Sequence, residues 1–152
     1  TELNELNVET SEQESRILDR IIKDADHMDL VTGSNVEECI IMCDPLRVTQ
    51  VVNNIIFNSY KYADTMINVT SRFENAGSKY LFIEIADKGP GVPEEELEMI
   101  TQKFKRGSNA GNKDGSGLGL YISDYLMNKM EGSLTVRNTG DGFAVEIGIK
   151  IS

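Results

Sequence analysis

The sequence predicts a single α/β domain, and three observations support this prediction. The stretch from Asp44 to Asp64 carries apolar residues at the i, i+3, i+4, i+7 and i+8 positions of one helical face; these are Val48, Val51, Val52, Ile55 and Ile56. Residues 66–73 and 80–86 have the pattern of two strands, joined by turn-forming residues at 74–78. The length of 152 residues suits one domain with a core of its own. We therefore expect the helix to bury its apolar face against a sheet.

The first element expected in the domain is a helix. Ser11 and Glu14 have the spacing of a capping box, and the apolar stripe that follows consists of Ile17, Leu18, Ile21 and Ile22. Residues 1–10 carry little pattern and are expected to form a linker or the tail of a preceding helix. The domain itself would span residues 11–152.

A strand is expected over residues 36–42, before the central helix. Asp44 is placed to cap that helix, and Pro45 suits its first turn because no helical hydrogen bond needs its missing amide hydrogen. The strand over residues 80–86 is nearly all apolar, which predicts a place in the middle of the sheet.

Two more helices and a hairpin are expected in the second half of the chain. Pro93 and the acidic residues 94–96 suit the first turn of a short helix. A longer helix is expected over residues 118–130, ended by Gly132. The strands of the final hairpin are expected at 133–138 and 143–151, around the turn Thr139-Gly140-Asp141-Gly142.

Composition and charge exclude several kinds of protein. The chain is 39% hydrophobic and 26% charged, with no apolar run near the roughly 18 residues of a membrane span. A net charge of -10 argues against a nucleic-acid partner, because phosphate backbones are bound through clustered Lys and Arg. Cys39 and Cys43 lack a CxxC spacing and nearby His residues, so we expect reduced, buried thiols in a cytoplasmic domain. The chain begins with Thr, which suggests a piece of a longer protein; whether that protein has a membrane anchor stays open.

Four polar residues share one edge of the central helix. Asn54 and Asn58 are one turn apart, and Lys61 and Tyr62 follow three and four residues beyond Asn58. Asn favours caps and turns over helix interiors, so two of them beside a core stripe need an explanation. A solvated helix edge is one interpretation, and a ligand site is the other.

Two glycine-rich segments could approach a ligand closely. The turn Gly115-Ser116-Gly117-Leu118-Gly119 precedes a helix, and amides at a helix N-terminus bind anions. The turn is neither a Walker A loop nor the GxGxxG of protein kinases, and glycines for tight helix packing are the alternative. Before it, the loop KRGSNAGNKDGSG and its neighbour Lys103 gather basic residues in an acidic chain; these are Lys103, Lys105, Arg106 and Lys113.

The polar residues suit a nucleotide. Asp87 follows a buried strand and could accept a hydrogen bond from an exocyclic amine, with Gly89 and Gly91 letting the backbone pass close to a flat base; a plain Asp-Gly turn is the alternative. Asn58 offers a neutral oxygen for a magnesium ion that keeps its other positions for phosphates and water. Lys61 could meet phosphate as a point charge, and Tyr62 could stack on the base or ribose or lie at the core edge.

Taken together and in order, these segments resemble the four boxes of the catalytic and ATP-binding domain of sensor histidine kinases. The Asn box is NNIIFNSYKYAD, the first glycine box DKGPGV, the phenylalanine box FKRG and the second glycine box GSGLGL. The resemblance covers about residues 36 to 152 and implies a two-layer α/β sandwich. In that fold a mixed sheet is covered on one face by helices, and a flexible lid closes over ATP.

The resemblance implies a role for each residue on the helix and the first glycine box. Asn58 would coordinate Mg²⁺, and Asn54 would support the phosphate and water network beside it. Lys61 would contact phosphate and Tyr62 would flank the nucleoside. Asp87, with Gly89 and Gly91, would read the adenine amino group.

It also implies roles for the lid. Arg106, and Lys105 beside it, would approach the γ-phosphate, and Phe104 would anchor the lid. The catalytic residues would be Asn54, Lys61 and Arg106. The segment that lets the lid fold over the triphosphate would be Gly115, Ser116, Gly117, Leu118 and Gly119, with Leu118 packing beneath it.

Asn54 separates the kinase from its relatives. The fold is similar to that of gyrase, mismatch-repair and chaperone ATPases and anti-sigma serine kinases, which carry a general-base Glu one turn before the metal-binding Asn. An amide cannot accept a proton near pH 7, so hydrolysis and serine phosphorylation are disfavoured, whereas a neutral histidine acceptor needs no base. We therefore expect γ-phosphoryl transfer to a histidine on a separate dimerisation domain of the same parent protein, which then serves a response regulator. The alternatives are a nucleotide-binding regulatory module without turnover and a hydrolysing ATPase.

Three departures from the family pattern are visible. Thr101 and Lys103 lie where an aromatic often precedes Phe104, and Phe143 and Ala144 lie where a small hydroxyl residue often contacts the base. The phosphoacceptor box is absent: His27, the only histidine, is expected to be a surface residue at a helix end. The isolated domain is expected to be monomeric, because the family's dimer contacts belong to other helices.

Overall fold

The computed structural model describes residues 6–62, 65–74, 77–95, 97 and 118–152, and of Lys61, Tyr62 and Leu118 the backbone alone. The helices of this part are α1 (Ile17–Ala25), α2 (Pro45–Tyr62) and α4 (Leu118–Lys129). Its strands are β1 (Ser11–Glu14), β2 (Val31–Thr32), β3 (Ile40–Cys43), β4 (Ile67–Phe73), β5 (Tyr80–Asp87), β6 (Ser133–Asn138) and β7 (Phe143–Lys150).

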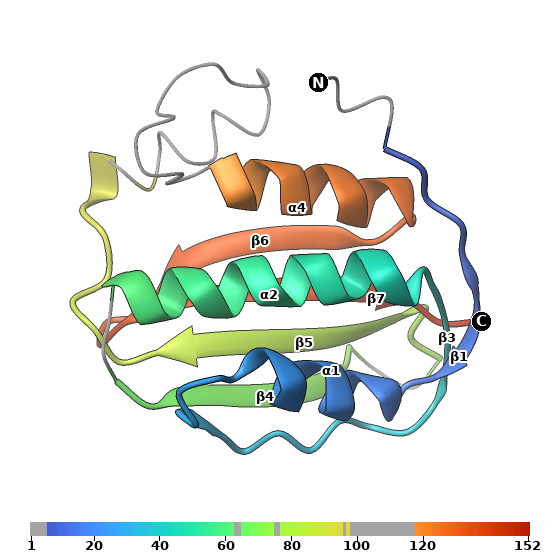
Figure 1. The fold of residues 1–152 in the computed structure, drawn as a ribbon, viewed down its shortest axis with the longest axis horizontal. Helices are drawn as coiled ribbons and strands as arrows, with labels where there is room; N and C mark the ends of the chain where they lie inside the picture. Colours follow the sequence, from blue (N-terminus) through green and yellow to red (C-terminus); the bar gives the residue numbers. More distant parts are fainter. Residues whose placement is uncertain (1–5, 63–64, 75–76, 96, 98–117) are drawn as a thin grey trace.

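Five strands form one mixed sheet in the order β2-β4-β5-β7-β6. Only β2 and β4 are parallel; the other neighbours are antiparallel. The helices α1, α2 and α4 lie side by side across one face of this sheet (Figure 1). The expected two-layer α/β sandwich is thus confirmed, and β5 lies in the middle of the sheet as its apolar sequence predicts.

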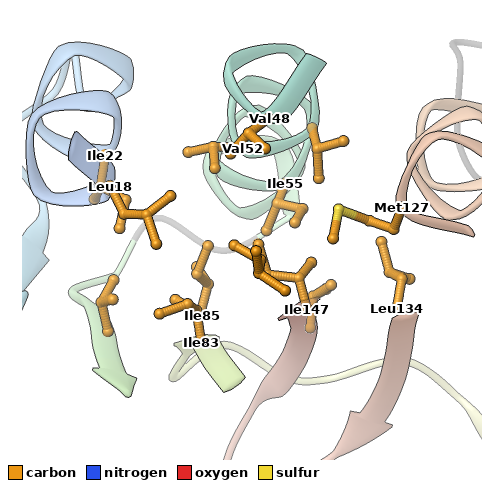
Figure 2. Close-up of a cluster of buried hydrophobic side chains, with 14 of the residues drawn as sticks. Leu18, Ile22, Val48, Val52, Ile55, Ile83, Ile85, Met127, Leu134 and Ile147 are labelled. Atoms are coloured by element: carbon orange, nitrogen blue, oxygen red, sulfur yellow. The ribbon is translucent and has the colours of Figure 1, made fainter. Parts of the chain in front are cut away.

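The core fills the space between the helices and the sheet. All five residues of the predicted α2 stripe are buried, with exposed fractions of 0% to 1%. Figure 2 shows Val48, Val52 and Ile55 of α2 above Ile85 of β5 and Ile147 of β7. The alternating burial along β5 sends every second residue into this layer, as a half-buried sheet requires.

The start of the domain differs from the prediction. Ser11 and Glu14 do not form a capping box, because residues 11–14 form β1, which pairs antiparallel with β3. α1 begins only at Ile17, and its N-cap residue Arg16 makes no side-chain capping bond. The backbone N–H and C=O groups of residues 11–14 bond to β3, a strand distant in sequence. A local capping pattern cannot reveal such a partner. The predicted apolar stripe is correct, since Leu18 and Ile22 are buried.

The expected strand over residues 36–42 is also shorter than predicted. β3 begins only at Ile40. The backbone just before it is hydrogen-bonded by the Ser15 side chain and not by the backbone of a neighbouring strand. The Ser15 hydroxyl donates to the Glu37 carbonyl and accepts from the Cys39 amide, at 2.6 and 2.9 Å. β2, which pairs in parallel with β4, was not predicted.

The central and second long helix and the two hairpins agree closely with the sequence, whereas the short helix expected from Pro93 lies largely outside the described residues and stays a prediction. Asp44 caps α2 through hydrogen bonds from the Leu46 and Arg47 amides. α4 ends just before Gly132, but the left-handed residue there is Glu131, with φ of +64°. Gly132 is needed for another reason: a Cβ at that position would overlap the Gly148 carbonyl of β7.

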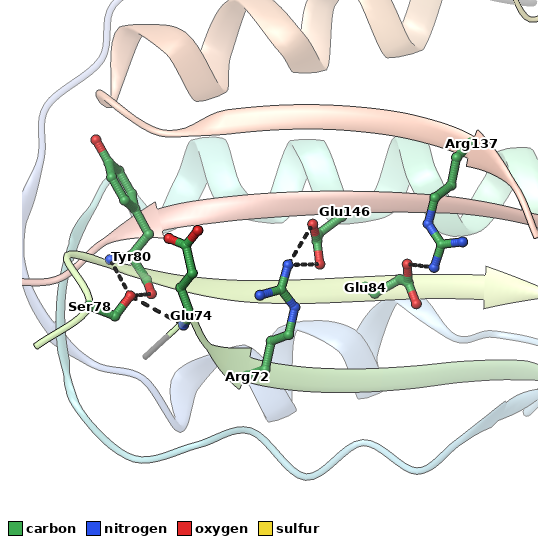
Figure 3. Close-up of polar contacts among 7 residues, drawn as sticks. All are labelled: Arg72, Glu74, Ser78, Tyr80, Glu84, Arg137 and Glu146. Carbon is green, nitrogen blue, oxygen red and sulfur yellow. Dashed lines mark hydrogen bonds and ion pairs between the residues drawn. The ribbon is translucent and has the colours of Figure 1, made fainter. Parts of the chain in front are cut away.

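The opposite face of the sheet carries charged side chains. Glu84 of β5 and Glu146 of β7 are direct cross-strand partners, an arrangement that like charges disfavour. Arg137 pairs with Glu84 at 2.6 Å and Arg72 pairs with Glu146 at 3.2 Å (Figure 3). Each glutamate therefore has its own arginine. Within the part of the chain that the structure describes, no helix has the length and apolarity to cross a membrane.

Candidate nucleotide site

The polar edge of α2 faces α4. The side-chain nitrogen of Asn54 donates to the Gly119 carbonyl and to the Ser123 hydroxyl, at 3.4 and 3.2 Å. The Asn box and the end of the second glycine box therefore lie together, although 65 residues separate them. Because both acceptors lie on the α4 side, the Asn54 side-chain oxygen is directed away from them.

Sequence reasoning missed Ser123. This residue is fully buried on α4, one helical turn after Gly119, and its hydroxyl accepts from Asn54. Its spacing of four from Gly119 could have placed it on the same helical face. The sequence contains no signal for its partner, because Asn54 lies 69 residues away.

Asn58 lies one turn beyond Asn54 and is half-buried. Among the described residues its side-chain amide makes no hydrogen bond, so its oxygen remains available to a ligand. An amide oxygen suits Mg²⁺, which takes hard oxygen ligands and keeps several waters. Nowhere in the described part do three or more His, Cys, Asp or Glu side chains gather as a metal site. Asn58 thus fits the role of a single protein ligand.

Asp87 ends β5 as a buried carboxylate, 5% exposed. Its Oδ1 accepts hydrogen bonds from the Gly89 amide at 3.0 Å and from the Phe143 amide at 3.1 Å. The bond from Gly89 is the Asp-Gly turn that the sequence left open as an alternative. Oδ2 accepts no hydrogen bond from any described residue, so the turn leaves one carboxylate oxygen for a ligand.

Phe143, one of the departures from the family pattern, contacts Asp87 through its backbone. Its backbone amide, which any residue except proline would supply, reaches the Asp87 carboxylate. The first glycine box is held by a second residue that the sequence analysis missed, Asn138 at the end of β6. Asn138 makes two hydrogen bonds to Val92.

The remaining predicted site residues are only partly described. Lys61 and Tyr62 are the last residues of α2, and Leu118 begins α4. The structure describes the backbone of these three residues and not their side chains. The lid residues lie outside the described residues altogether, so their predicted roles stay predictions. They are Phe104, Lys105, Arg106, Gly115, Ser116 and Gly117, together with Thr101, Lys103 and Lys113.

The cysteines and the histidine lie away from this site. Cys39 and Cys43 are both free thiols; Cys39 is half-buried and Cys43 is buried. Burial, with a smaller contribution from the Asp44 charge, raises the pKa of Cys43 to about 11. His27 is exposed in the turn after α1, as predicted.

Comparison with known proteins agrees with this geometry. Residues 43–152 match the family described as histidine kinase-, DNA gyrase B-, and HSP90-like ATPase. The sensor protein TorS of Escherichia coli (strain K12) is 32% identical over 117 residues, which are 75% of this chain and 12% of TorS. The sensor histidine kinase WalK of Bacillus subtilis (strain 168) is 28% identical over 124 residues, 79% of this chain and 20% of WalK. The chain thus spans a fifth or less of these two relatives.

Solved structures share the fold. The mycobacterial sensor histidine kinase MprB matches with a TM-score of 0.72 and 21% identity, over 93% of this chain and 98% of that structure. The ATP binding domain of PrrB from Mycobacterium tuberculosis matches with a TM-score of 0.70 and 23% identity, over 94% and 98%. The chain therefore belongs to the histidine kinase-, DNA gyrase B- and HSP90-like ATPase family, as an ATP-binding catalytic domain of the sensor histidine kinase type.

Proposed function

We propose that this domain binds Mg-ATP and transfers its γ-phosphoryl group to a histidine on a separate dimerisation domain of the parent protein. In this reaction the bond between the γ-phosphorus and ADP breaks, and a P–N bond to the acceptor imidazole forms. The observation that carries the proposal is Asn54. Its amide occupies the position that the family resemblance assigns to a general-base Glu in hydrolysing relatives, and its nitrogen donates toward α4. An amide cannot deprotonate water or a serine near pH 7.

The chain's own residues supply binding and electrostatic stabilisation. The free oxygen of Asp87 would accept from the adenine amino group, and Gly89 and Gly91 would let the base approach. Asn58 would hold Mg²⁺, which supplies positive charge beside the phosphates when bound. Asn54 would support the phosphate and water network by accepting hydrogen bonds from water through its side-chain oxygen.

Lys61 at the end of α2 and the lid residues would complete the site. Lys61 and Arg106 would offset the negative charge that spreads over the γ-phosphoryl oxygens, and Lys105 would add to it. Phe104 would anchor the lid. Gly115, Ser116, Gly117 and Gly119 would allow backbone amides near the start of α4 to approach the triphosphate, with Leu118 packed beneath them.

The partners follow from the same proposal. The histidine would lie on a dimerisation domain of the parent protein, and the phosphoryl group would pass from there to a response regulator. The domain would act in the cytoplasm and, by itself, as a monomer. The presence of Lys61, Arg106 and a full second glycine box in the sequence favours turnover over a regulatory module that only binds nucleotide.

The proposal is tested with γ-labelled ATP, Mg²⁺ and the parent protein's upstream helical segment. We expect acid-labile, alkali-stable label on that segment. Asn58→Ala and Asp87→Ala should each lower the labelling rate on the order of 100-fold, because each removes a contact to the bound nucleotide. Asn53→Ala is the matched control: Asn53 is an exposed neighbour on the same helix and should label normally.

Two other results would point elsewhere. Release of inorganic phosphate without a phosphoprotein would mean that the argument from Asn54 is wrong and that the domain is an ATPase. ATP binding with neither product would favour the regulatory module.

A further inference from the structure

The turn between β6 and β7 is fastened to the first glycine box at several points. The Phe143 amide donates to Asp87, and the Lys88 ammonium lies 3.8 Å from the Asp141 carboxylate. Gly142 is buried, and a Cβ there would overlap the Asp87 carbonyl oxygen. The end of this hairpin therefore packs directly against the first glycine box, next to Asp87, the carboxylate proposed to read the base.

Asn138 makes the most specific of these contacts. Its Oδ1 accepts from the Val92 amide at 3.0 Å, and its Nδ2 donates to the Val92 carbonyl at 2.8 Å. One side chain thus pairs with both backbone groups of a single residue, as a neighbouring strand would. Only an amide side chain combines an acceptor and a donor in this way; Asp would keep the first bond and lose the second.

Gly91 shows how closely the two segments approach. Its φ is +73°, a conformation that residues with a Cβ rarely adopt. A Cβ there would also lie 2.9 Å from the Asn138 Oδ1 and 3.2 Å from the Gly142 carbonyl. Asn138 therefore binds the peptide group on each side of Val92, next to Gly91.

These contacts bear directly on Asp87. The two amides that orient its Oδ1 come from the segments that Asn138 joins: Gly89 lies two residues before Gly91, and Phe143 follows the β6–β7 turn. If the two segments separate, the Asp87 Oδ1 loses the hydrogen bonds that orient the carboxylate. The Oδ2 atom is then no longer held in one orientation toward the base. The Asp87 Oδ2 can accept a hydrogen bond, which favours a base that presents an amino group.

We propose that Asn138 is a positioning residue for base recognition, and that it makes the site selective for a 6-amino purine over a 6-keto purine by holding the first glycine box against the β6–β7 turn. This inference rests on the proposed function, because it takes Asp87 as the group that reads the base.

The experiment measures dissociation constants of the chain for ATP and for inosine triphosphate, which carries a carbonyl in place of the amino group. The unmodified chain binds ATP more tightly. Asn138→Ala lowers the ratio of the two affinities about tenfold, through weaker ATP binding, since an oriented acceptor is lost. Asn138→Asp, which keeps the bond from the Val92 amide, gives an intermediate ratio.

Asn128→Ala is the matched control. Asn128 is exposed on α4, and its side chain bonds only to Asp124 of the same helix, so its loss leaves the ratio unchanged. Thermal unfolding of each variant separates recognition from folding, and Asn138→Asp still tests the inference if Asn138→Ala does not fold.

Equal weakening of both nucleotides, or no weakening, in Asn138→Ala and Asn138→Asp would overturn the positioning role and leave the proposed function standing. A ratio that Asp87→Asn leaves unchanged would overturn the inference too, because Asp87 would then not read the base. Absence of ATP binding by the unmodified chain would overturn the proposed function as well.

Discussion

Asp44 uses both oxygens of one buried carboxylate to join two segments. Its Oδ1 accepts from the Leu46 and Arg47 amides and caps α2, while its Oδ2 accepts from the Glu9 amide at 2.8 Å. Arg47 adds a bond from its Nε to the Asn7 carbonyl. The segment before β1 is therefore attached to the first turn of the helix that carries the Asn box.

The two roles of Asp44 predict different costs for two substitutions. Asp44→Ala removes the cap and the acceptor for Glu9, and should lower the free energy of unfolding by about 2 kcal/mol. Asp44→Asn keeps an oxygen for the cap and loses the acceptor for Glu9, so we expect about 1 kcal/mol. Urea unfolding followed by circular dichroism measures both. Equal losses would mean that the cap contributes nothing, and no loss in Asp44→Asn would mean that the bond to Glu9 contributes nothing.

At the scale of the element, one face of α2 packs into the core and a different face carries the residues of the candidate site. Its apolar stripe anchors the helix on the sheet, and Asn54 meets α4 on the neighbouring edge. On its other side Tyr60 donates to Asp26 and accepts from the Met28 amide, which ties α2 to the turn after α1. The position of Asn58 therefore depends on packing that Asn58 does not itself make.

The two sides of α2 can be compared directly by truncation. Ile55 is 1% exposed, whereas Phe57, two residues later, is 65% exposed. Ile55→Ala should cost about 3 kcal/mol of stability because it leaves a cavity, and Phe57→Ala should change stability by less than about 0.5 kcal/mol. Chemical denaturation of the two variants side by side checks this. A large loss in Phe57→Ala would show that its ring packs against another part of the chain.

At the scale of the whole molecule, a single buried layer separates the helices from the sheet. A second, two-stranded sheet of β1 and β3 closes one end of the fold and meets the C-terminus through a bridge between Ile41 and Ile151. Cys43 is buried at this junction with 0% exposure. Because burial disfavours the thiolate in the folded state, the titration of this thiol is linked to global stability.

This linkage predicts a loss of stability in alkali. Burial raises the pKa of Cys43 from 9.0 to about 11, so the unfolded chain loses the proton first as the pH rises. The contribution of Cys43 is fully present below pH 9 and falls by on the order of 2 kcal/mol as the pH reaches 11. Unfolding measured from pH 8 to pH 11 should show a shallower decline in Cys43→Ala. An identical decline in both proteins would contradict the linkage.

Much of the fold could be predicted because its signals are local. The apolar spacing in α2, the cap at Asp44 and the alternation along β5 act within a few residues, so the sequence reveals them. Two of the failures have a physical reason that is not local. Ser11 and Glu14 belong to a strand because β3 lies beside them, and β2 exists because the Asp26 carboxylate accepts from the Leu30 and Val31 amides at the edge of β4.

The sequence by itself determined the fold class, the order of the four boxes and the identities of Asn54, Asn58 and Asp87. Only the tertiary structure decided which side-chain atoms of these residues already make hydrogen bonds within the protein. The partners of Asn54 lie 65 and 69 residues away, Phe143 lies 56 residues from Asp87, and Val92 lies 46 residues from Asn138. A hydrogen bond between such positions forms only after the core has brought α2, α4 and the hairpin together, and no pattern within one segment encodes it.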